Sequence, residues 1–161
     1  MPTETIVFAL VTFLHDLFTV VWIGGLITLG LTVMPSAKKA LGKGPQTKKL
    51  MEVIQKRNSV WVYVSMAGLV LTGLLQANRA PAFQGLLSFG NTYSAVLTVK
   101  HILVLVMIAI TLYRSLALGS VSTPAQEKLK IRLLMLNIIL GISILLLSGF
   151  TAALSSGIPA A

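Results

Sequence analysis

The strongest constraint on the fold of this chain is that four of its segments are apolar over lengths that can cross a bilayer. A membrane-spanning helix needs roughly 20 apolar residues. The segments that meet this requirement run from Ile6 to Met34, and from about Val60 to Ala77, Tyr93 to Leu118 and Leu133 to Leu154. Because proline interrupts a regular helix, we expect Pro35 to end the first span. The pattern predicts an all-α fold: an integral membrane four-helix bundle that forms a single domain over residues 1–161.

The composition also indicates a membrane protein. Hydrophobic residues make up 55% of the 161 residues and charged residues only 11%, whereas soluble domains carry about 25% charged residues. The chain has no cysteine, which excludes thiolate metal sites, iron–sulfur clusters and disulfides. The region before the first apolar run has Glu4 but no lysine or arginine. Because a signal peptide begins with a basic region, we do not interpret this run as one.

The basic residues predict how the chain is oriented. Its net charge of +9 would suggest nucleic acid binding in a soluble protein, but the lysines and arginines cluster in two loops. Such loops face the cytoplasm. The loop between the first two spans contains Lys38, Lys39, Lys43, Lys48, Lys49, Lys56 and Arg57, and the loop between the last two contains Lys128, Lys130 and Arg132. We therefore predict a multi-pass protein of the cell membrane, with both termini outside and no nucleic acid partner. The second helix is expected to begin near Pro45.

The only two histidines, His15 and His101, both lie inside apolar segments. An ionisable side chain within a membrane marks a functional site by default. The first and third spans run in the same direction, and the histidines lie about ten and eight residues into them, or roughly 15 and 12 Å from the outer ends. Two histidines at one depth predict a shared ligand, and haem b is the ligand that we expect.

Haem ligation suits this arrangement because imidazoles bind iron from either face of a porphyrin, and helical bundles hold cofactors in their cores. In an up-down-up-down bundle the first and third helices are diagonal to each other. We therefore predict a haem between them, with His15 and His101 as its axial metal ligands. The alternative metal is copper. The alternatives for the second axial ligand are Lys100 or a methionine within the spans, namely Met66, Met107 or Met135.

Two charged residues adjoin the histidines. Asp16 follows His15, and Lys100 precedes His101. Each step along a helix rotates by ~100°, so both charges swing to the same side if the histidines face each other. We predict an intramembrane ion pair between them, or contacts from these residues to the haem propionates.

Trp22 and Gly25 are further candidates for the cofactor pocket. Trp22 shares the helix face of His15 and could stack on a porphyrin. Gly25 lacks a side chain and allows close approach of a helix or a flat ligand. Helix packing explains both residues equally well. The corresponding structural alternative for His15 is a hydrogen bond to a neighbouring helix.

Three short motifs resemble two related families of membrane proteins. His15 with the stretch Trp22-Ile23-Gly24-Gly25-Leu26 resembles the first helix of copper-resistance D proteins and of HemJ-type protoporphyrinogen oxidases. Leu50-Met51-Glu52 with Lys56-Arg57 is similar to a Leu-Met-Glu-Lys-Arg stretch of HemJ-type proteins. Lys100, with Tyr113 following it on the same span, resembles the lysine-bearing third helix of both families.

The resemblance implies a haem b protein of four or five membrane helices in which His15 and Lys100 are functional. HemJ-type proteins oxidise protoporphyrinogen IX to protoporphyrin IX, and copper-resistance D proteins are linked to copper uptake. The chain departs from the HemJ pattern in two places. The arginine expected near the end of the first helix is missing from Leu29 to Pro35, which argues against the oxidase activity. His101 replaces an apolar residue, which favours a six-coordinate haem that transfers electrons.

These observations predict a cytochrome b-like protein that transfers electrons between a substrate and a redox partner in the membrane. One alternative is an oxidoreductase of the HemJ type with Lys100 as the catalytic residue, and another is a copper transport protein. The expected partners are membrane lipid, the porphyrin and an unidentified redox partner. A homo-oligomer is an open alternative, because glycines on lipid-facing surfaces can serve dimerisation, although the spans contain no Gly-x-x-x-Gly motif.

Overall fold

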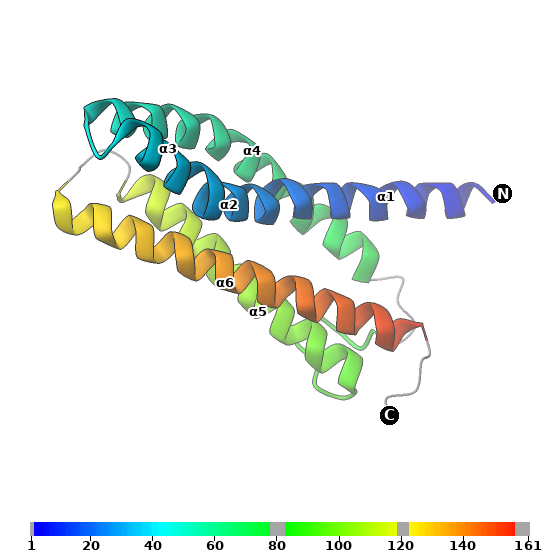
Figure 1. Cartoon of the computed structure of the whole chain (residues 1–161). Coiled ribbons are helices and arrows are strands. Elements are labelled where there is room, and N and C mark those ends of the chain that lie inside the picture. Colours follow the sequence, from blue (N-terminus) through cyan, green and yellow to red (C-terminus); the bar gives the residue numbers. More distant parts are fainter. Residues whose placement is uncertain (1, 78–82, 119–122, 157–161) are drawn as a thin grey trace. The chain divides into compact units, whose positions relative to one another are not determined.

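The computed structural model describes residues 2–77, 83–118 and 123–156, and most of them are helical (Figure 1). The chain divides into two compact units, Met1–Thr72 and Gly73–Ala161. The described residues contain four helices that are long and apolar enough to cross a membrane: Thr3–Leu41, Pro45–Gln76, Thr92–Leu116 and Pro124–Ser155. The predicted all-α fold with four membrane spans is confirmed. The predictions of one domain and of the outside termini stay predictions.

The first span is a composite helix that continues past Pro35. It consists of α1 (Thr3–Thr19), a π-helical turn (Val20–Gly24), α2 (Gly25–Thr28), a second π-helical turn (Leu29–Val33) and α3 (Met34–Leu41). The prediction that Pro35 ends this helix is therefore wrong. In an α-helix a proline ring clashes with the carbonyl four residues earlier. Here the π turn directly before Met34 widens the helix at that carbonyl, and Pro35 stands in the first turn of α3.

The first unit is a hairpin in which α4 (Pro45–Ala77) returns beside the composite helix (Figure 1). Gly42 makes the reversal with a φ of 72°, a conformation that glycine adopts at little cost. The Thr47 hydroxyl donates to the Gly42 carbonyl at 2.7 Å and fixes the start of α4 to the turn. Leu29, Ala37 and Met51 form a buried cluster close to this turn. The predicted helix start near Pro45 is confirmed.

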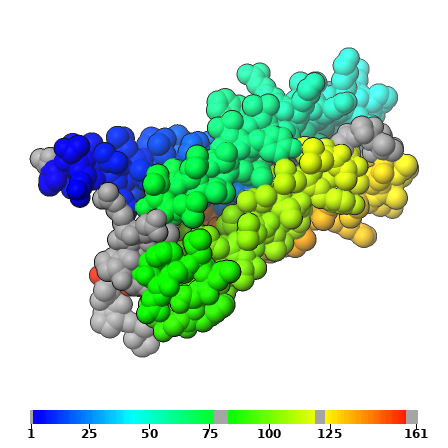
Figure 2. All heavy atoms as spheres, turned by 180° about the vertical axis from the view of Figure 1, so that it is seen from behind, coloured from blue at the N-terminus to red at the C-terminus, as the bar shows by residue number. Residues whose placement is uncertain are grey.

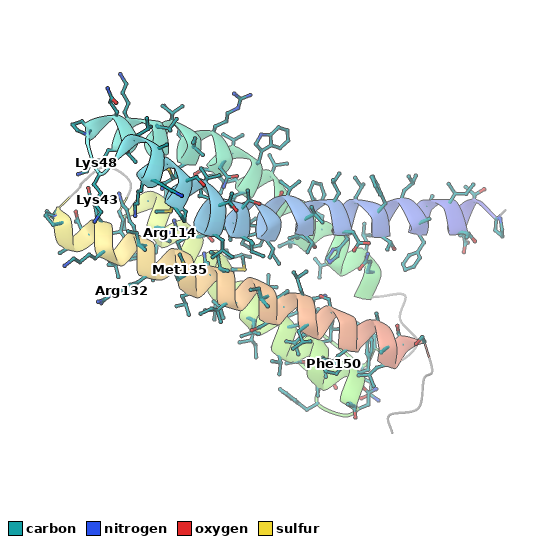
Figure 3. All side chains as sticks on the ribbon, viewed as in Figure 1. Lys43, Lys48, Arg114, Arg132, Met135 and Phe150 are labelled. Atoms are coloured by element: carbon teal, nitrogen blue, oxygen red, sulfur yellow. The ribbon has the colours of Figure 1, made fainter. Side chains whose placement is uncertain are left out.

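Most of the basic residues lie on helices rather than in loops. Lys38 and Lys39 belong to the last turn of α3, and Lys48 belongs to the first turns of α4. Figure 3 shows Lys43 and Lys48 at the turn of the first hairpin. The composite helix has 39 residues, or about 58 Å, whereas the hydrocarbon core is about 30 Å thick. The helices are thus long enough for their charged ends to stand outside the membrane.

The predicted orientation can be tested with single cysteines, because the chain has none of its own. Gln46→Cys, at the exposed start of α4, is expected to react with an impermeant maleimide only after the cells are opened. Gln84→Cys, in the exposed segment before α5 (Thr92–Leu116), is expected to react in intact cells. The reverse labelling pattern would show that the basic ends of the helices face outward.

The second unit is built on a pair of packed helices, α5 and α6 (Pro124–Ser155). The Asn91 side chain caps α5 by accepting from the Ser94 amide at 2.7 Å, and Thr123 forms a capping box with Gln126 at the start of α6. Figure 3 shows Arg132, Met135 and Phe150 at successive levels along α6, with Arg114 on α5. The buried face of α6 has helical spacing and consists of Leu134, Asn137, Ile138, Gly141, Ile144 and Thr151.

The segment 83–91 has no helix and folds back on the start of α5. The Gln84 amide donates to the Ser94 hydroxyl at 3.2 Å, and the Thr98 hydroxyl lies 3.1 Å from the Ser88 carbonyl. In Figure 2 this segment and the first turns of α5, both green, form one mass of atoms. Leu87 and Phe89 are exposed on it. Exposed apolar side chains at a helix end are suited to anchoring that end in the membrane interface.

A buried hydrogen bond joins α5 to α6. The Asn137 side chain is fully buried, and its Nδ2 donates to the Thr111 hydroxyl at 2.9 Å. That hydroxyl in turn donates to the Met107 carbonyl at 2.8 Å. Buried polar pairs of this kind hold membrane helices together because lipid offers their groups no other partner.

Thr111→Val is expected to destabilise the protein by about 1 kcal/mol, because it leaves the Asn137 amide without its acceptor. The measurement is the unfolding midpoint in mixed detergent micelles. Ser143→Ala is the matched control, since the Ser143 hydroxyl donates to the Ile139 carbonyl of its own helix. Equal losses in the two variants would show that the interhelical bond contributes nothing.

Candidate functional site

His15 is half-buried on α1 and reaches α4 through its ring. Its Nδ1 lies 2.9 Å from the Thr72 hydroxyl oxygen. The Thr72 oxygen lies 2.7 Å from the carbonyl oxygen of Gly68, one turn earlier on α4. The contact that we considered as the structural alternative, a hydrogen bond from His15 to a neighbouring helix, is therefore present. It engages Nδ1 of the ring.

These two hydrogen bonds assign the tautomer of His15. A carbonyl only accepts, so the single hydroxyl proton of Thr72 is donated to Gly68. The Thr72 oxygen then accepts from His15, and Nδ1 carries the proton. In a neutral imidazole the other nitrogen, Nε2, holds the lone pair and is the atom that can coordinate a metal.

Phe18 packs against α4 beside this hydrogen bond. It follows His15 by one turn of α1, and its ring occupies the space that a Cβ at Gly68 would take. The absence of a side chain at Gly68 thus lets the Phe18 ring pack directly against the backbone of α4. Farther along the same hairpin, a Cβ at Gly25 would lie 3.4 Å from Oδ1 of Asn58 on α4. The group that lies close to Gly25 is therefore a side chain of α4. The role of Gly25 at a cofactor stays a prediction.

Trp22 is almost completely buried, with 1% of its surface exposed. It lies in the first π-helical turn, and such turns are frequent at functional sites. Among the described residues, its Nε1 has no hydrogen-bond partner. A buried N–H group without a partner is costly, so this indole is a candidate donor for a bound acceptor such as a carboxylate. Leu26, which follows Trp22 by four residues on the same helix face, is also buried.

His101 is half-buried on α5, on the same helix face as the buried residues Leu97 and Thr98. Its Nδ1 lies 2.7 Å from the Leu97 carbonyl oxygen, one turn earlier. Because the carbonyl can only accept, Nδ1 of His101 carries the proton and Nε2 holds the lone pair. His101 therefore has the same tautomer as His15, assigned from a different partner in the other unit.

The two histidines also lie at similar distances from the starts of their helices. His15 is 12 residues after Thr3, and His101 is 9 residues after Thr92. At 1.5 Å per residue these are about 18 and 14 Å along each helix axis. Their common depth within a membrane stays a prediction.

Lys100 and Asp16 differ in their surroundings. Lys100 is half-buried, and on α5 it shares a face with the buried Met107 and Thr111, which follow at helical spacing. Asp16 is exposed on α1. Their ion pair stays a prediction.

The methionines and acidic residues offer little support for a copper site. Met66 and Met107 are buried, whereas Met135 is 37% exposed on α6. Within residues 2–77, 83–118 and 123–156, no three histidine, cysteine or acidic side chains gather where they could hold a metal ion. No contact among the described residues favours copper over haem.

Thr72 is the residue that our sequence reasoning missed, although the sequence contains a signal for it. In a helical hairpin, residues at equal distances from the turn lie at the same level. With Lys43 at the centre of the Gly42–Gly44 turn, His15 is 28 residues before it and residue 71 is 28 after it. The same count pairs Phe18 with Gly68. Counting outward from the turn places Leu71 at the level of His15, and Thr72 is the next residue.

Comparison of the chain with protein families, curated proteins and solved structures finds no match. The resemblance to copper-resistance D and HemJ-type proteins therefore stays a prediction from short motifs.

Proposed function

We propose that this protein is a haem b-binding, electron-transferring protein of the cell membrane, with His15 and His101 as axial ligands. The observation that carries the proposal is that Nδ1 of each histidine lies within hydrogen-bond distance of an oxygen, from which we infer the same tautomer for both. In each, Nδ1–H is donated to an oxygen, the Thr72 hydroxyl in one case and the Leu97 carbonyl in the other. Metal-ligating histidines almost always make this second hydrogen bond, which orients the ring and raises the basicity of Nε2.

Other residues suit the propionates of a haem. Trp22 presents a buried N–H that lacks an acceptor among the described residues, and a carboxylate oxygen is such an acceptor. Lys100 places a cationic side chain one residue before His101 within an apolar helix. A lysine in this setting is stabilised by an anionic group.

The proposed ligands decide which chemistry is available. Bound haem supplies a one-electron couple through its iron. His15 and His101 would hold the iron through two imidazoles, a ligand pair that would favour electron transfer over oxygen activation. The side chains around them would set the potential through burial and hydrogen bonding.

The test is a titration of haem-free protein, purified in detergent, with haemin. We expect stoichiometric uptake, with a sharp Soret band and narrow split bands after reduction. His101→Ala is expected to retain haem more weakly and to lose the six-coordinate spectrum. Protein that takes up no haem above the level of empty micelles would contradict the proposal.

A second candidate function is a HemJ-like oxidase that converts protoporphyrinogen IX to protoporphyrin IX. The observation that favours it is the half-buried position of Lys100 within α5. Membranes containing the protein would then oxidise protoporphyrinogen IX faster than control membranes. Lys100→Met would abolish that excess without loss of haem. A plain cytochrome would show no excess in either form.

A further inference from the structure

We infer that Thr72 is the positioning residue of this site. It holds His15 in the Nδ1–H tautomer, so that Nε2 is the coordinating nitrogen. The inference deepens the proposed function and rests on it where haem is concerned. The tautomer itself is a property of the protein without haem and can be measured separately.

The geometry forms a short relay of hydrogen bonds. His15 Nδ1–H donates to Thr72 Oγ1 at 2.9 Å, and Thr72 donates to the Gly68 carbonyl at 2.7 Å. A second carbonyl, that of Leu69, lies 3.5 Å from the same oxygen. Both carbonyl oxygens within reach of the hydroxyl proton belong to the backbone of α4. The Thr72 proton is therefore directed toward its own helix, and its lone pair is directed to the imidazole.

The residues around Thr72 limit the access of water to these two hydrogen bonds. Thr72 is 6% exposed, so water has little access to its hydroxyl. The Phe18 ring, which packs on Gly68, covers α4 one turn away. Threonine has one side-chain torsion to the hydroxyl and is β-branched, which restricts its rotamers. A buried, rotamer-restricted acceptor on a rigid helix fixes both the tautomer and the orientation of the ring.

The consequence for a bound metal is chemical as well as geometric. An acceptor on Nδ1–H gives the imidazole more imidazolate character, which strengthens the bond from Nε2 to ferric iron. Removing the acceptor should therefore weaken haem binding and shift the reduction potential to a more positive value. Loss of an outer-shell partner of this kind typically costs 10–100-fold in metal affinity.

Two substitutions at Thr72 distinguish the effect of the hydroxyl group from the effect of side-chain volume. Thr72→Val keeps the shape and removes the hydroxyl, whereas Thr72→Ser keeps the hydroxyl. Thr12→Val is the matched control. Thr12 lies one turn before His15, and its hydroxyl donates to the Phe8 carbonyl of its own helix. The first readout is the ¹⁵N NMR spectrum of histidine-labelled, haem-free protein carrying His101→Gln, so that His15 gives the only histidine side-chain signals.

We expect the Nδ1–H tautomer in the parent, in Thr72→Ser and in Thr12→Val. In Thr72→Val we expect a shift toward the Nε2–H tautomer, which free imidazole side chains favour. With His101 restored, haem affinity should fall at least about 10-fold in Thr72→Val, and Thr72→Ser should restore it. The potential of the loaded protein should become more positive in Thr72→Val alone.

The two possible failures are distinct. If the parent shows the Nε2–H tautomer, or if Thr72→Val leaves the Nδ1–H tautomer unchanged, the role of Thr72 is overturned whatever the protein binds. If the tautomers follow the expectation but the wild-type protein takes up no haem, the proposed function fails. In that outcome the hydrogen-bonding role of Thr72 is supported and its role toward haem is overturned.

Discussion

His15→Ala is expected to abolish stable haem binding, so the purified variant should have no Soret band after detergent exchange. The reason is that alanine removes Nε2, the nitrogen that the Thr72 hydrogen bond leaves with the lone pair. His101 alone then has to hold the iron. The measurement is the absorbance ratio of Soret to protein bands after size-exclusion chromatography, compared with wild type.

Imidazole provides the control for this variant. His15→Gly leaves room for a free imidazole, and adding imidazole should restore part of the Soret band if His15 is a ligand. Thr12→Val, on the same helix, should keep the full band. A His15→Gly variant that binds as much haem as wild type without imidazole would contradict ligation by His15.

Gly68→Leu is expected to lower the free energy of unfolding by about 2–3 kcal/mol, because overpacking a close helix contact forces side chains and backbone to move. Even a Cβ at this position would overlap the Phe18 ring. The separation of α1 from α4 should also break the bond from His15 to Thr72. The measurement is the unfolding midpoint in mixed micelles.

Two further variants check that this effect comes from the contact with Phe18. Gly149→Leu places the same side chain on α6, where a Cβ would meet no atom within 4 Å, and it should have little effect. Phe18→Ala combined with Gly68→Leu should recover part of the loss, because the added side chain can occupy the space of the ring. Equal destabilisation at Gly149 and Gly68 would show that leucine acts through helix propensity or lipid contact instead.

The membrane spans could be predicted because they depend on composition along the chain. Runs such as Tyr93 to Leu118 are apolar enough to favour a lipid environment. A helix also makes its backbone hydrogen bonds within its own segment, as lipid requires. The ends were harder to predict. Pro35 is a strong helix breaker in an α-helix, but a π turn ahead of it changes the position of the carbonyl with which it would clash. Such a turn leaves no simple signal in the sequence.

The candidate site, like the fold, could be predicted from the sequence only in part. His15 and His101 could be identified from sequence because an ionisable group in an apolar run is unusual. Their hydrogen-bond partners could not be identified by periodicity alone. Thr72 is an ordinary residue in a membrane helix until the hairpin brings it beside His15, and Leu97 contributes only a backbone carbonyl. Gly25 had two interpretations from sequence, and the structure shows the contact of a helix there, with Asn58.

The most direct test of the central claim, that two histidines of this chain bind haem, is the electron paramagnetic resonance spectrum of the oxidised, haem-loaded protein. We expect the rhombic low-spin signal of iron with two neutral imidazole ligands, and its conversion to a high-spin signal in His101→Ala. A wild-type spectrum that contains only high-spin iron, or no protein-bound iron, would contradict the account.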